Sequence, residues 1–569
     1  MLKERRQGKL LIGFLILIGH LCFITAPSAA DKPPPAAAVA SAHHLATEAG
    51  EIILKQGGNA FDAAVAISAA LAVVEPSGSG LGGGGFYLIH EAAKDRDIMI
   101  DAREKAPKAA HRDMYLDQDG NPIKYASING PLAAGIPGIP AALEHLAKQY
   151  GKLPLTTTLA PAIAYAKEGF NVDNSYVGKM KWRFKAVKEH PSAAKIFLDD
   201  NDLPEPGWKL KQADLADTLA AIANEGAAGF YQGTIAQRLI EGSKKYGGIW
   251  SFDDLESYQI IEREPIRSSF HDITLISAAP PSSGGIALAT MLNILEGYDL
   301  NKLSESARIH LITEAMRRAY RDRAQYLGDA DFVEVPIPQL IDPLYAAELR
   351  SSINLNKATP SSELEGIGLQ QQGEDTTHFS VIDHEGNRVS ATLSINLPFG
   401  SGFVAPGTGV LLNNEMDDFS VKPLTPNSYS LVGAEANAIA PEKRPLSSMS
   451  PTFLVSKDRV AILGTPGGSR IITMVLHGIL AFSEHKPVGE WVSLPRYHHQ
   501  FLPDHIQFEE HAFSAETQKK LNSLGHKLKP IKRRFGNMQA VLWDKAANRV
   551  SAASDPRGIG SVSIVDSEK

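Results

Sequence analysis

Thr376-Thr377-His378-Phe379-Ser380-Val381 opens a strand-like run deep inside a chain of 569 residues. β-Branched and aromatic residues in this order suit any half-buried strand. A threonine at an abrupt strand start can also be a nucleophile, provided that a base takes its proton. A free α-amine on the same residue can serve, because its pKa of roughly 7.7 to 8.0 leaves much of it unprotonated near neutrality. That amine exists only if the chain is cut, so the chemistry predicts cleavage between Asp375 and Thr376.

The residues before Thr376 suit such a cut. Residues 354–374 are polar, rich in Ser, Gln and Gly, and show little periodicity, which indicates an exposed loop. A self-cleaving precursor needs a flexible backbone immediately before the bond that is cut. We therefore expect residues 31–375 to form a large subunit and residues 376–569 to form a small subunit.

The residues after Thr376 predict a hairpin. A short segment with turn chemistry separates two strand-like runs, 376–383 and 388–396. Antiparallel pairing across this turn brings Ser394 opposite Thr376, to within a residue or so. The Ser394 hydroxyl can then bond the Thr376 hydroxyl or amine and hold it for attack, with Asn396 two residues further on the same face.

Composition and charge narrow the class of protein. Hydrophobic residues make up 43% of the chain and charged residues 21%, so the chain can bury a large core. The net charge of -7 argues against a nucleic-acid binder, because phosphate contacts call for a basic face.

Strand-like runs alternate with helical patterns and no internal repeat is visible, which indicates an α/β or α+β protein. The clearest helical patterns cover residues 139–150, 213–224, 235–246 and 304–327.

The N-terminus has the order of a secretory signal peptide. A basic segment, Lys3 to Lys9, precedes an apolar run from Leu10 to Ile24 and a stretch of small residues that ends at Ala30. The apolar run is shorter than the roughly 20 residues that span a bilayer, which disfavours a stable membrane anchor. We expect a signal peptide over residues 1–30 and an exported, periplasmic or secreted protein. The single cysteine, Cys22, lies inside this segment, so the mature chain would have no thiol and no disulfide.

Three later segments carry groups suited to a zwitterionic ligand. Paired carboxylates suit an ammonium, and adjacent serine hydroxyls suit a carboxylate. The backbone N–H groups of a Gly-Gly turn can stabilise an oxyanion. These groups occur in Leu412-Asn413-Asn414-Glu415-Met416-Asp417-Asp418-Phe419, Arg444-Pro445-Leu446-Ser447-Ser448-Met449-Ser450-Pro451 and Gly464-Thr465-Pro466-Gly467-Gly468-Ser469-Arg470.

With these segments the sequence resembles the γ-glutamyltransferase (γ-glutamyltranspeptidase) family of N-terminal-nucleophile hydrolases, from about residue 38 to about residue 557. The resemblance implies an α+β fold, a four-layer αββα sandwich built jointly by the large and small subunits. It rests on an ordered set of motifs: Gly82 to Phe86, Asp101 to Glu104, Pro280 to Gly285, Thr376 to His378, Asn413 to Phe419, Pro445 to Pro451, Gly467 to Arg470 and Ala553 to Arg557.

The resemblance also implies a role for each candidate site residue. Thr376 would first cleave the precursor after Asp375 and then act as the catalytic nucleophile, supported by Ser394. The other implied assignments are the α-carboxylate ligands Arg103, Ser447 and Ser448, the α-ammonium ligands Asn396, Glu415 and Asp418, the oxyanion-hole residues Gly467 and Gly468, and the lid residue Tyr429.

The activity implied by the resemblance is cleavage of the γ-glutamyl amide of glutathione and related compounds. Thr376 would form a γ-glutamyl ester, which water resolves in hydrolysis and an acceptor amino acid or peptide resolves in transfer. No cofactor is expected. No catalytic metal is expected either, because the pairs His43-His44 and His498-His499 have no further ligands at zinc-like spacing.

Two positions and one adjacent pair of residues vary from familiar bacterial relatives. Ser394 stands where many carry threonine, which keeps the hydroxyl but loosens its rotamer. Glu415 stands where some carry glutamine and others glutamate, so the pocket gains a negative charge. Leu397-Pro398 replaces a more polar pair, and its effect on acceptor choice stays open.

Two other functions are compatible with the residues alone. The first is a cephalosporin-acylase-like amidase of the same superfamily, whose glutaryl substrates lack the amine. Asp418 argues against it, because a buried carboxylate without an ammonium partner is costly. The second is an exported solute-binding protein that neither cleaves itself nor turns over a substrate. Mass spectrometry of the mature protein distinguishes a self-cleaving enzyme from a solute-binding protein, since the binding protein stays one chain and the enzyme becomes two.

Overall fold

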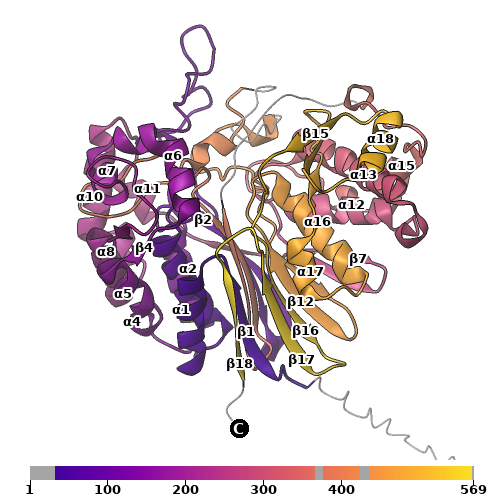
Figure 1. The fold of residues 1–569 in the computed structure, drawn as a ribbon. Coiled ribbons are helices and arrows are strands. Elements are labelled where there is room, and N and C mark those ends of the chain that lie inside the picture. Colours follow the sequence, from indigo (N-terminus) through magenta and orange to yellow (C-terminus); the bar gives the residue numbers. More distant parts are fainter. Residues whose placement is uncertain (1–31, 365–375, 423–434, 567–569) are drawn as a thin grey trace, which may run out of the picture. The chain divides into compact units, whose positions relative to one another are not determined.

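Two β-sheets lie face to face in the computed structural model, which describes residues 32–364, 376–422 and 435–566 (Figure 1). Strands β1, β9 and β10 of one sheet contact β12, β16 and β17 of the other. The predicted signal peptide, Asp375 and Tyr429 lie outside the described residues.

The first sheet has seven antiparallel strands, and it combines strands from before and after Thr376. The hairpin predicted after Thr376 is present in its centre, between β1 and β2. The order is β18 (Ser561–Asp566), β1 (Ala36–Ser41), β9 (Thr377–Ile382), β10 (Arg388–Ser394), β2 (Gly84–Glu91), β3 (Arg96–Ala102) and β6 (Ile261–Arg263).

The second sheet has six antiparallel strands and is likewise mixed. Four of its strands follow Thr376 in the chain and two precede it. The order is β17 (Arg549–Ser554), β16 (Gln539–Asp544), β12 (Arg459–Gly464), β11 (Thr452–Val455), β8 (Ile273–Ser277) and β7 (Ile266–Phe270).

Helices cover the outer face of each sheet, which completes four layers in the order αββα (Figure 1). The expected α+β sandwich, built jointly from both sides of Thr376, is therefore confirmed. The first sheet packs against α1 (His44–Lys55), α2 (Ala60–Val74) and α3 (Ile139–Gln149), while α5 (Ala160–Glu168) packs on α2 and α8 (Ala213–Glu225) packs on α5. The second packs against α12 (Gly284–Leu295), α16 (Arg470–Ser483) and α17 (Val488–Ser493), while α13 (Glu305–Tyr326) packs on α12.

Helix α2 shows how the sequence positions the hairpin. Every residue of α2 is buried, and its many alanines let it approach both α1 and the strands β9 and β10. Its N-terminus carries a capping box between Asn59 and Asp62. The Asp383 carboxylate, at the β9–β10 turn, also accepts a hydrogen bond from the Ala60 N–H at 2.9 Å. The turn is thus tied to the positive end of a buried helix.

The glycine run before β2 is explained by close backbone contact. A Cβ atom on Gly83 would lie 2.1 Å from the Ser394 carbonyl oxygen, and one on Gly82 would lie 2.1 Å from the Leu411 carbonyl oxygen. Only glycine allows these approaches without a shift of the backbone. The run therefore determines how closely β2 packs at the end of β10, where Ser394 lies.

We predict that Gly83→Ala destabilises the fold, because the new methyl group must displace the backbone at Ser394. Overpacking of this kind costs about 1–3 kcal/mol, and the thermal unfolding midpoint should fall accordingly. Gly178→Ala is the matched control, since Gly178 lies in α6 (Asn174–Lys188) and a Cβ there meets nothing within 4 Å. Equal unfolding midpoints for the two variants would contradict this explanation.

Candidate active site

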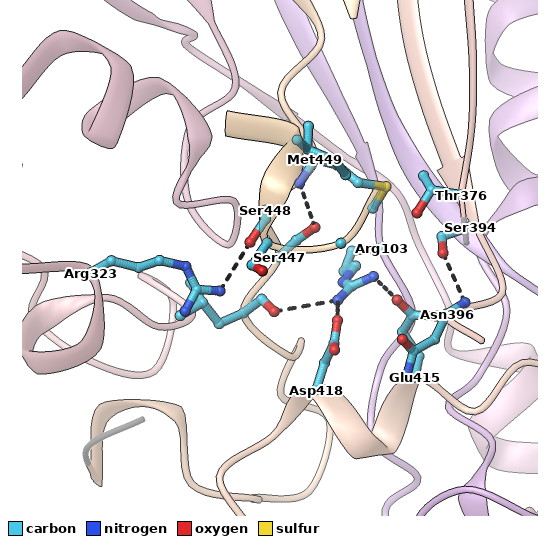
Figure 2. A pocket seen from close by; sticks show the side chains of 14 residues that line it. Arg103, Arg323, Thr376, Ser394, Asn396, Glu415, Asp418, Ser447, Ser448 and Met449 are labelled. Carbon is cyan, nitrogen blue, oxygen red and sulfur yellow. Dashed lines mark hydrogen bonds and ion pairs between the residues drawn. The ribbon is translucent and has the colours of Figure 1, made fainter. Parts of the chain in front are cut away.

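The register of the hairpin places Ser394 opposite Thr376. The last paired residues of β9 and β10 are Thr377 and Leu393, so the next position across the ladder joins Thr376 to Ser394. The two side chains lie side by side at the edge of a cavity that both residues line (Figure 2). The predicted register is confirmed.

Thr376 is held in a buried position at the start of β9, with only 4% of its surface exposed. Gly78 belongs to the loop after α2 and approaches the Thr376 carbonyl oxygen, since a Cβ on Gly78 would lie 3.4 Å from it. The neighbouring Thr377 hydroxyl donates to the Glu75 carboxylate at 2.5 Å. The end of α2 and its glycine-rich loop therefore fix the backbone around Thr376.

The cavity at Thr376 brings together most of the residues predicted for the site. They come from the residue after β3, from the hairpin and its end, from the 3-10 helix η5 (Glu415–Asp418) and from two later loops, and they face one space (Figure 2). The predicted residues that line it are Arg103, Thr376, Ser394, Asn396, Glu415, Asp418, Ser447, Ser448 and Gly468. Gly467 lines a second cavity, which Thr376 also borders.

Arg103 is the centre of a buried ionic cluster (Figure 2). Its guanidinium forms ion pairs with the Glu415 and Asp418 carboxylates, and the Glu104 carboxylate lies 3.6 Å away. Its Nε also donates to the Pro445 carbonyl oxygen at 3.2 Å. The expected carboxylate ligand and two of the expected ammonium ligands therefore contact one another directly.

Burial dominates the titration of this cluster. It raises the pKa of the Glu415 and Asp418 carboxyls above the usual range, and the Arg103 charge opposes that rise. Burial, with help from the Glu415 charge, raises the pKa of Glu104 as well. The cluster holds more carboxylates than Arg103 can neutralise, so a cationic group entering the cavity is favoured.

The Ser447–Ser448 segment is held by the Pro280 to Gly285 motif. Ser447 donates its N–H to the Pro281 carbonyl oxygen at 2.8 Å, and its own carbonyl oxygen accepts from the Ser283 N–H and hydroxyl at 2.8 and 2.7 Å. The Ser447 hydroxyl oxygen accepts the Met449 N–H at 3.1 Å. Its proton is therefore available to a ligand.

Arg323, on α13, lines the same cavity and was not predicted from the sequence. It is 97% buried, and its Nε donates to the Ser283 hydroxyl at 2.9 Å. One Nη donates to the Ser448 hydroxyl at 3.2 Å. Burial lowers its pKa to about 10, which leaves it charged near neutrality. In sequence it is one of several arginines in a polar helical pattern, which is typical of a solvated surface, so only its burial distinguishes it.

Asn396 reaches the cavity by a route that differs from the predicted one. Strand β10 ends at Ser394, and Asn396 has a φ of 70°, in the left-handed region. Asparagine tolerates this conformation better than most residues. Its N–H donates to the Ser394 hydroxyl at 2.8 Å, and its side-chain amide donates to the Asn414 carbonyl oxygen at 2.9 Å. A turn, not strand alternation, places Asn396 beside Ser394.

Gly467 and Gly468 lie between β12 and the N-terminus of α16. Their φ angles are 138° and 57°, which favour glycine. Within the described ranges, neither backbone N–H donates a hydrogen bond. Two amides beside Thr376 at a helix N-terminus form a setting suited to an anionic oxygen.

The histidine pairs considered in the sequence serve the packing of the fold. His43 caps α1 by accepting the Leu45 N–H, and its ring stacks on His44 with 4.5 Å between centroids. His498 bonds Thr473, and His499 forms a hydrogen bond with the Asp504 carboxylate at 3.3 Å.

One further group of described residues has ligand-like spacing for a metal: His310, Glu314 and His526. Two of its ring nitrogens, His310 Nδ1 and His526 Nε2, already contact one another at 2.8 Å. The Glu314 carboxylate is ion-paired with Arg317 and Arg318 at 3.2 and 2.6 Å. These two guanidinium groups disfavour a cation here.

Comparison with known proteins places this geometry in a family. The sequence profile of the family described as Gamma-glutamyltranspeptidase matches residues 46–565. A glutathione hydrolase proenzyme of Escherichia coli (strain K12) is 42% identical over 527 residues, which cover 92% of this chain and 90% of that protein. The corresponding proenzyme of Pseudomonas sp. (strain A14) is 45% identical over 495 residues, 86% of each chain.

Solved structures show the same fold. A cephalosporin acylase from Bacillus halodurans superposes with a TM-score of 0.81 at 26% identity, covering 96% of this chain and 99% of its own. A γ-glutamyltranspeptidase chain from Helicobacter pylori superposes with a TM-score of 0.56 at 42% identity, covering 57% of this chain and 94% of its own. On the profile match and the identity to its relatives, this chain belongs to the γ-glutamyltranspeptidase family.

Proposed function

We propose that this chain is a self-processing γ-glutamyl hydrolase and transferase whose donors include glutathione. The observation that carries the proposal is the position of Thr376: it lies immediately before the buried strand β9 and lines the same cavity as Arg103, Glu415 and Asp418. The printed name of the E. coli and Pseudomonas relatives, glutathione hydrolase proenzyme, supports both the donor and the processing.

In the proposed mechanism, cleavage between Asp375 and Thr376 frees the Thr376 α-amine. That amine takes the Thr376 hydroxyl proton while the oxygen attacks the γ-carbonyl carbon of the donor. The N–H groups of Gly467 and Gly468 stabilise the negative oxygen of the tetrahedral intermediate. The proton then passes to the leaving amine, and a γ-glutamyl ester remains on Thr376.

The ionic cluster is matched to the zwitterionic end of a γ-glutamyl group. A ligand ammonium placed against Glu415 and Asp418, and a ligand carboxylate placed against Arg103, give these three residues groups of opposite charge. The Ser447 and Ser448 oxygens already accept hydrogen bonds, from the Met449 N–H and from Arg323 respectively. Both hydroxyl protons therefore remain to be donated to the carboxylate.

A glutaryl acylase is the second candidate, because the B. halodurans cephalosporin acylase shares the fold over nearly the whole chain. A glutaryl group has the carboxylate but lacks the ammonium. It would leave the cluster of Glu104, Glu415 and Asp418 with uncompensated negative charge, which is costly in a buried site. The charges of the site therefore favour the γ-glutamyl donor.

Export is part of the proposal. The order of charge and apolarity at the N-terminus supports a signal peptide over residues 1–30. In the described ranges, the helices are all too short or too polar to cross a bilayer. Residues 31–375 would then become the large subunit and residues 376–569 the small subunit.

The proposal predicts that Thr376→Ala abolishes processing. The purified protein should migrate as one chain of full mature length on a denaturing gel and should not hydrolyse an L-γ-glutamyl anilide. Thr376→Ser is the control, since it retains a hydroxyl and should still yield two subunits. Two subunits from the alanine variant would exclude Thr376 as the processing residue.

Asp418→Asn should reverse the preference of the enzyme for γ-glutamyl substrates, which carry an α-amine, over glutaryl substrates, which lack it. Loss of one charged hydrogen bond costs about 1.5–3 kcal/mol, or roughly ten- to hundredfold in kcat/KM for an L-γ-glutamyl anilide. The rate on a glutaryl anilide should fall little or rise. Both substrates are assayed on the processed enzyme. If the wild-type enzyme prefers the glutaryl anilide, the acylase function is correct instead.

Arg323→Gln should weaken recognition of the α-carboxylate by releasing the Ser448 hydroxyl. We expect kcat/KM for an L-γ-glutamyl anilide to fall about tenfold, since a charged hydrogen bond is lost. The rate on a 4-aminobutyryl anilide, which lacks the carboxylate, should change little. Arg321→Gln is the control on the same helix, because Arg321 pairs with Asp322 outside the cavity. Equal losses on both anilides would show a general structural role for Arg323.

A further inference from the structure

Helix α13 contacts the loops of the active site at two points, three residues apart in its sequence. Arg323 donates to the Ser448 hydroxyl, as described above. Tyr320 donates its hydroxyl proton to the Ser469 carbonyl oxygen. Residues three apart lie on the same face of a helix. One face of α13 therefore contacts both the segment that carries Ser448 and the residue that follows the two glycines.

The Tyr320 side chain is well suited to hold the Ser469 carbonyl group. Only 2% of Tyr320 is exposed, and burial raises the pKa of its hydroxyl above the usual range, so the hydroxyl stays protonated and can donate. Its ring packs edge-on against His498, with 5.6 Å between the centroids. This contact limits rotation of the side chain and fixes the direction from which the hydroxyl meets Ser469.

The Ser469 side chain is bound separately from its carbonyl group. Its hydroxyl donates to Gln500 Oε1 at 2.7 Å. That oxygen can only accept, so His498 Nε2, which lies 2.8 Å from it, is also a donor. Burial lowers the pKa of His498 well below the usual range, which keeps the ring neutral. Ser469 is therefore held by Tyr320, which precedes Thr376 in the chain, and by Gln500, which follows it.

The position of Ser469 in turn affects the glycine pair. The Arg470 N–H donates to the Gly467 carbonyl oxygen and the Ile471 N–H donates to the Gly468 carbonyl oxygen, both at 3.1 Å. Both glycines have φ angles in the region that glycine enters freely, so these two bonds alone do not fix the direction of their N–H groups. Anchoring of the next residue restricts that freedom.

We infer that Tyr320 is a positioning residue of the oxyanion hole: through the Ser469 carbonyl group it holds the Gly467 and Gly468 N–H groups where the negative oxygen forms. The inference rests on the proposed function, which assigns those two N–H groups to the oxyanion. Tyr320 does not line the cavity itself, so it acts on the reaction only through the loop.

A displaced oxyanion hole should slow the chemistry without weakening substrate binding. The negative charge on the carbonyl oxygen develops only on the way to the tetrahedral intermediate, so the ground state gains little from the hole. Attack of Thr376 on the amide and attack of water on the ester both form such an oxyanion. Both steps therefore slow together, which lowers kcat and leaves KM nearly unchanged.

The first test is Tyr320→Phe, measured on the processed enzyme with an L-γ-glutamyl anilide. The variant keeps the ring and loses the hydroxyl. We expect kcat to fall about tenfold to hundredfold, as for reacting groups misplaced by up to about 1 Å, with KM unchanged to within about twofold. Tyr345→Phe is the matched control, because the Tyr345 hydroxyl donates to Asp322 on the same helix at 3.0 Å, outside the cavity, and its loss should leave kcat unchanged.

The second test compares two inhibitors of the same variant. A boronic acid that carries the α-ammonium and α-carboxylate of glutamate accepts the Thr376 hydroxyl oxygen on boron and mimics the tetrahedral intermediate. Its inhibition constant should rise in Tyr320→Phe by about the factor by which kcat falls. L-Norvaline has the same α-amino acid end but no side-chain oxygen, so its inhibition constant should not change.

Three results would overturn the inference. They are an unchanged kcat in Tyr320→Phe, an equal rise in both inhibition constants, which would show a general loss of pocket structure, and failure of the variant to split into two subunits, which would give Tyr320 a role in folding or processing instead. The proposed function is tested separately by the wild-type enzyme, and it fails if that enzyme does not hydrolyse the γ-glutamyl anilide.

Discussion

The antiparallel register between β9 and β10 is the constraint on which the site depends. Successive side chains of a strand point to opposite faces, so a slip of one residue would turn Ser394 away from Thr376. Neighbouring strands fix the register on both sides, because β1 and β2 flank the hairpin. Hydroxyls fix it from the second sheet as well: Ser380 donates to the Gln539 carbonyl oxygen at 3.1 Å, and Ser390 donates to the Leu463 carbonyl oxygen at 3.0 Å.

The hairpin could be predicted because it depends on local sequence patterns. The positions of Asn396 and Arg323 could not, because they depend on tertiary packing. Turn residues and the period of two were enough to bring Ser394 opposite Thr376. The left-handed turn at Asn396 was missed, since strand alternation says nothing about where a strand ends. Arg323 was missed because helical periodicity does not show that a polar face is covered by another layer. The resemblance to a family supplied the expected roles of Arg103, Glu415 and Asp418; Arg103 lies far from the other two in the chain.

Electrostatics explains why the pocket suits a zwitterion. A buried carboxylate loses its hydration, and one guanidinium cannot compensate three carboxylates. Arg103 meets Glu104, Glu415 and Asp418 within ion-pair distance, so carboxyl groups outnumber the guanidinium group that they contact. A ligand with only a carboxylate adds a negative charge to the site, whereas a ligand that also carries an ammonium adds no net charge and places its positive group against the carboxyls. In the proposed function, the groups that are costly in isolation therefore select the ligand.

The order of folding and activation follows from where these residues lie in the chain. Arg103 and Arg323 precede Thr376, and Ser394, Glu415 and Gly468 follow it, so neither segment alone contains the cavity. Both sheets also mix strands from the two segments. In the proposed mechanism the catalytic base is the amine that cleavage creates, and cleavage requires Thr376 to be held at the start of β9. The chain must therefore fold as one piece before it is cut, and the interleaved strands keep the two products together afterwards.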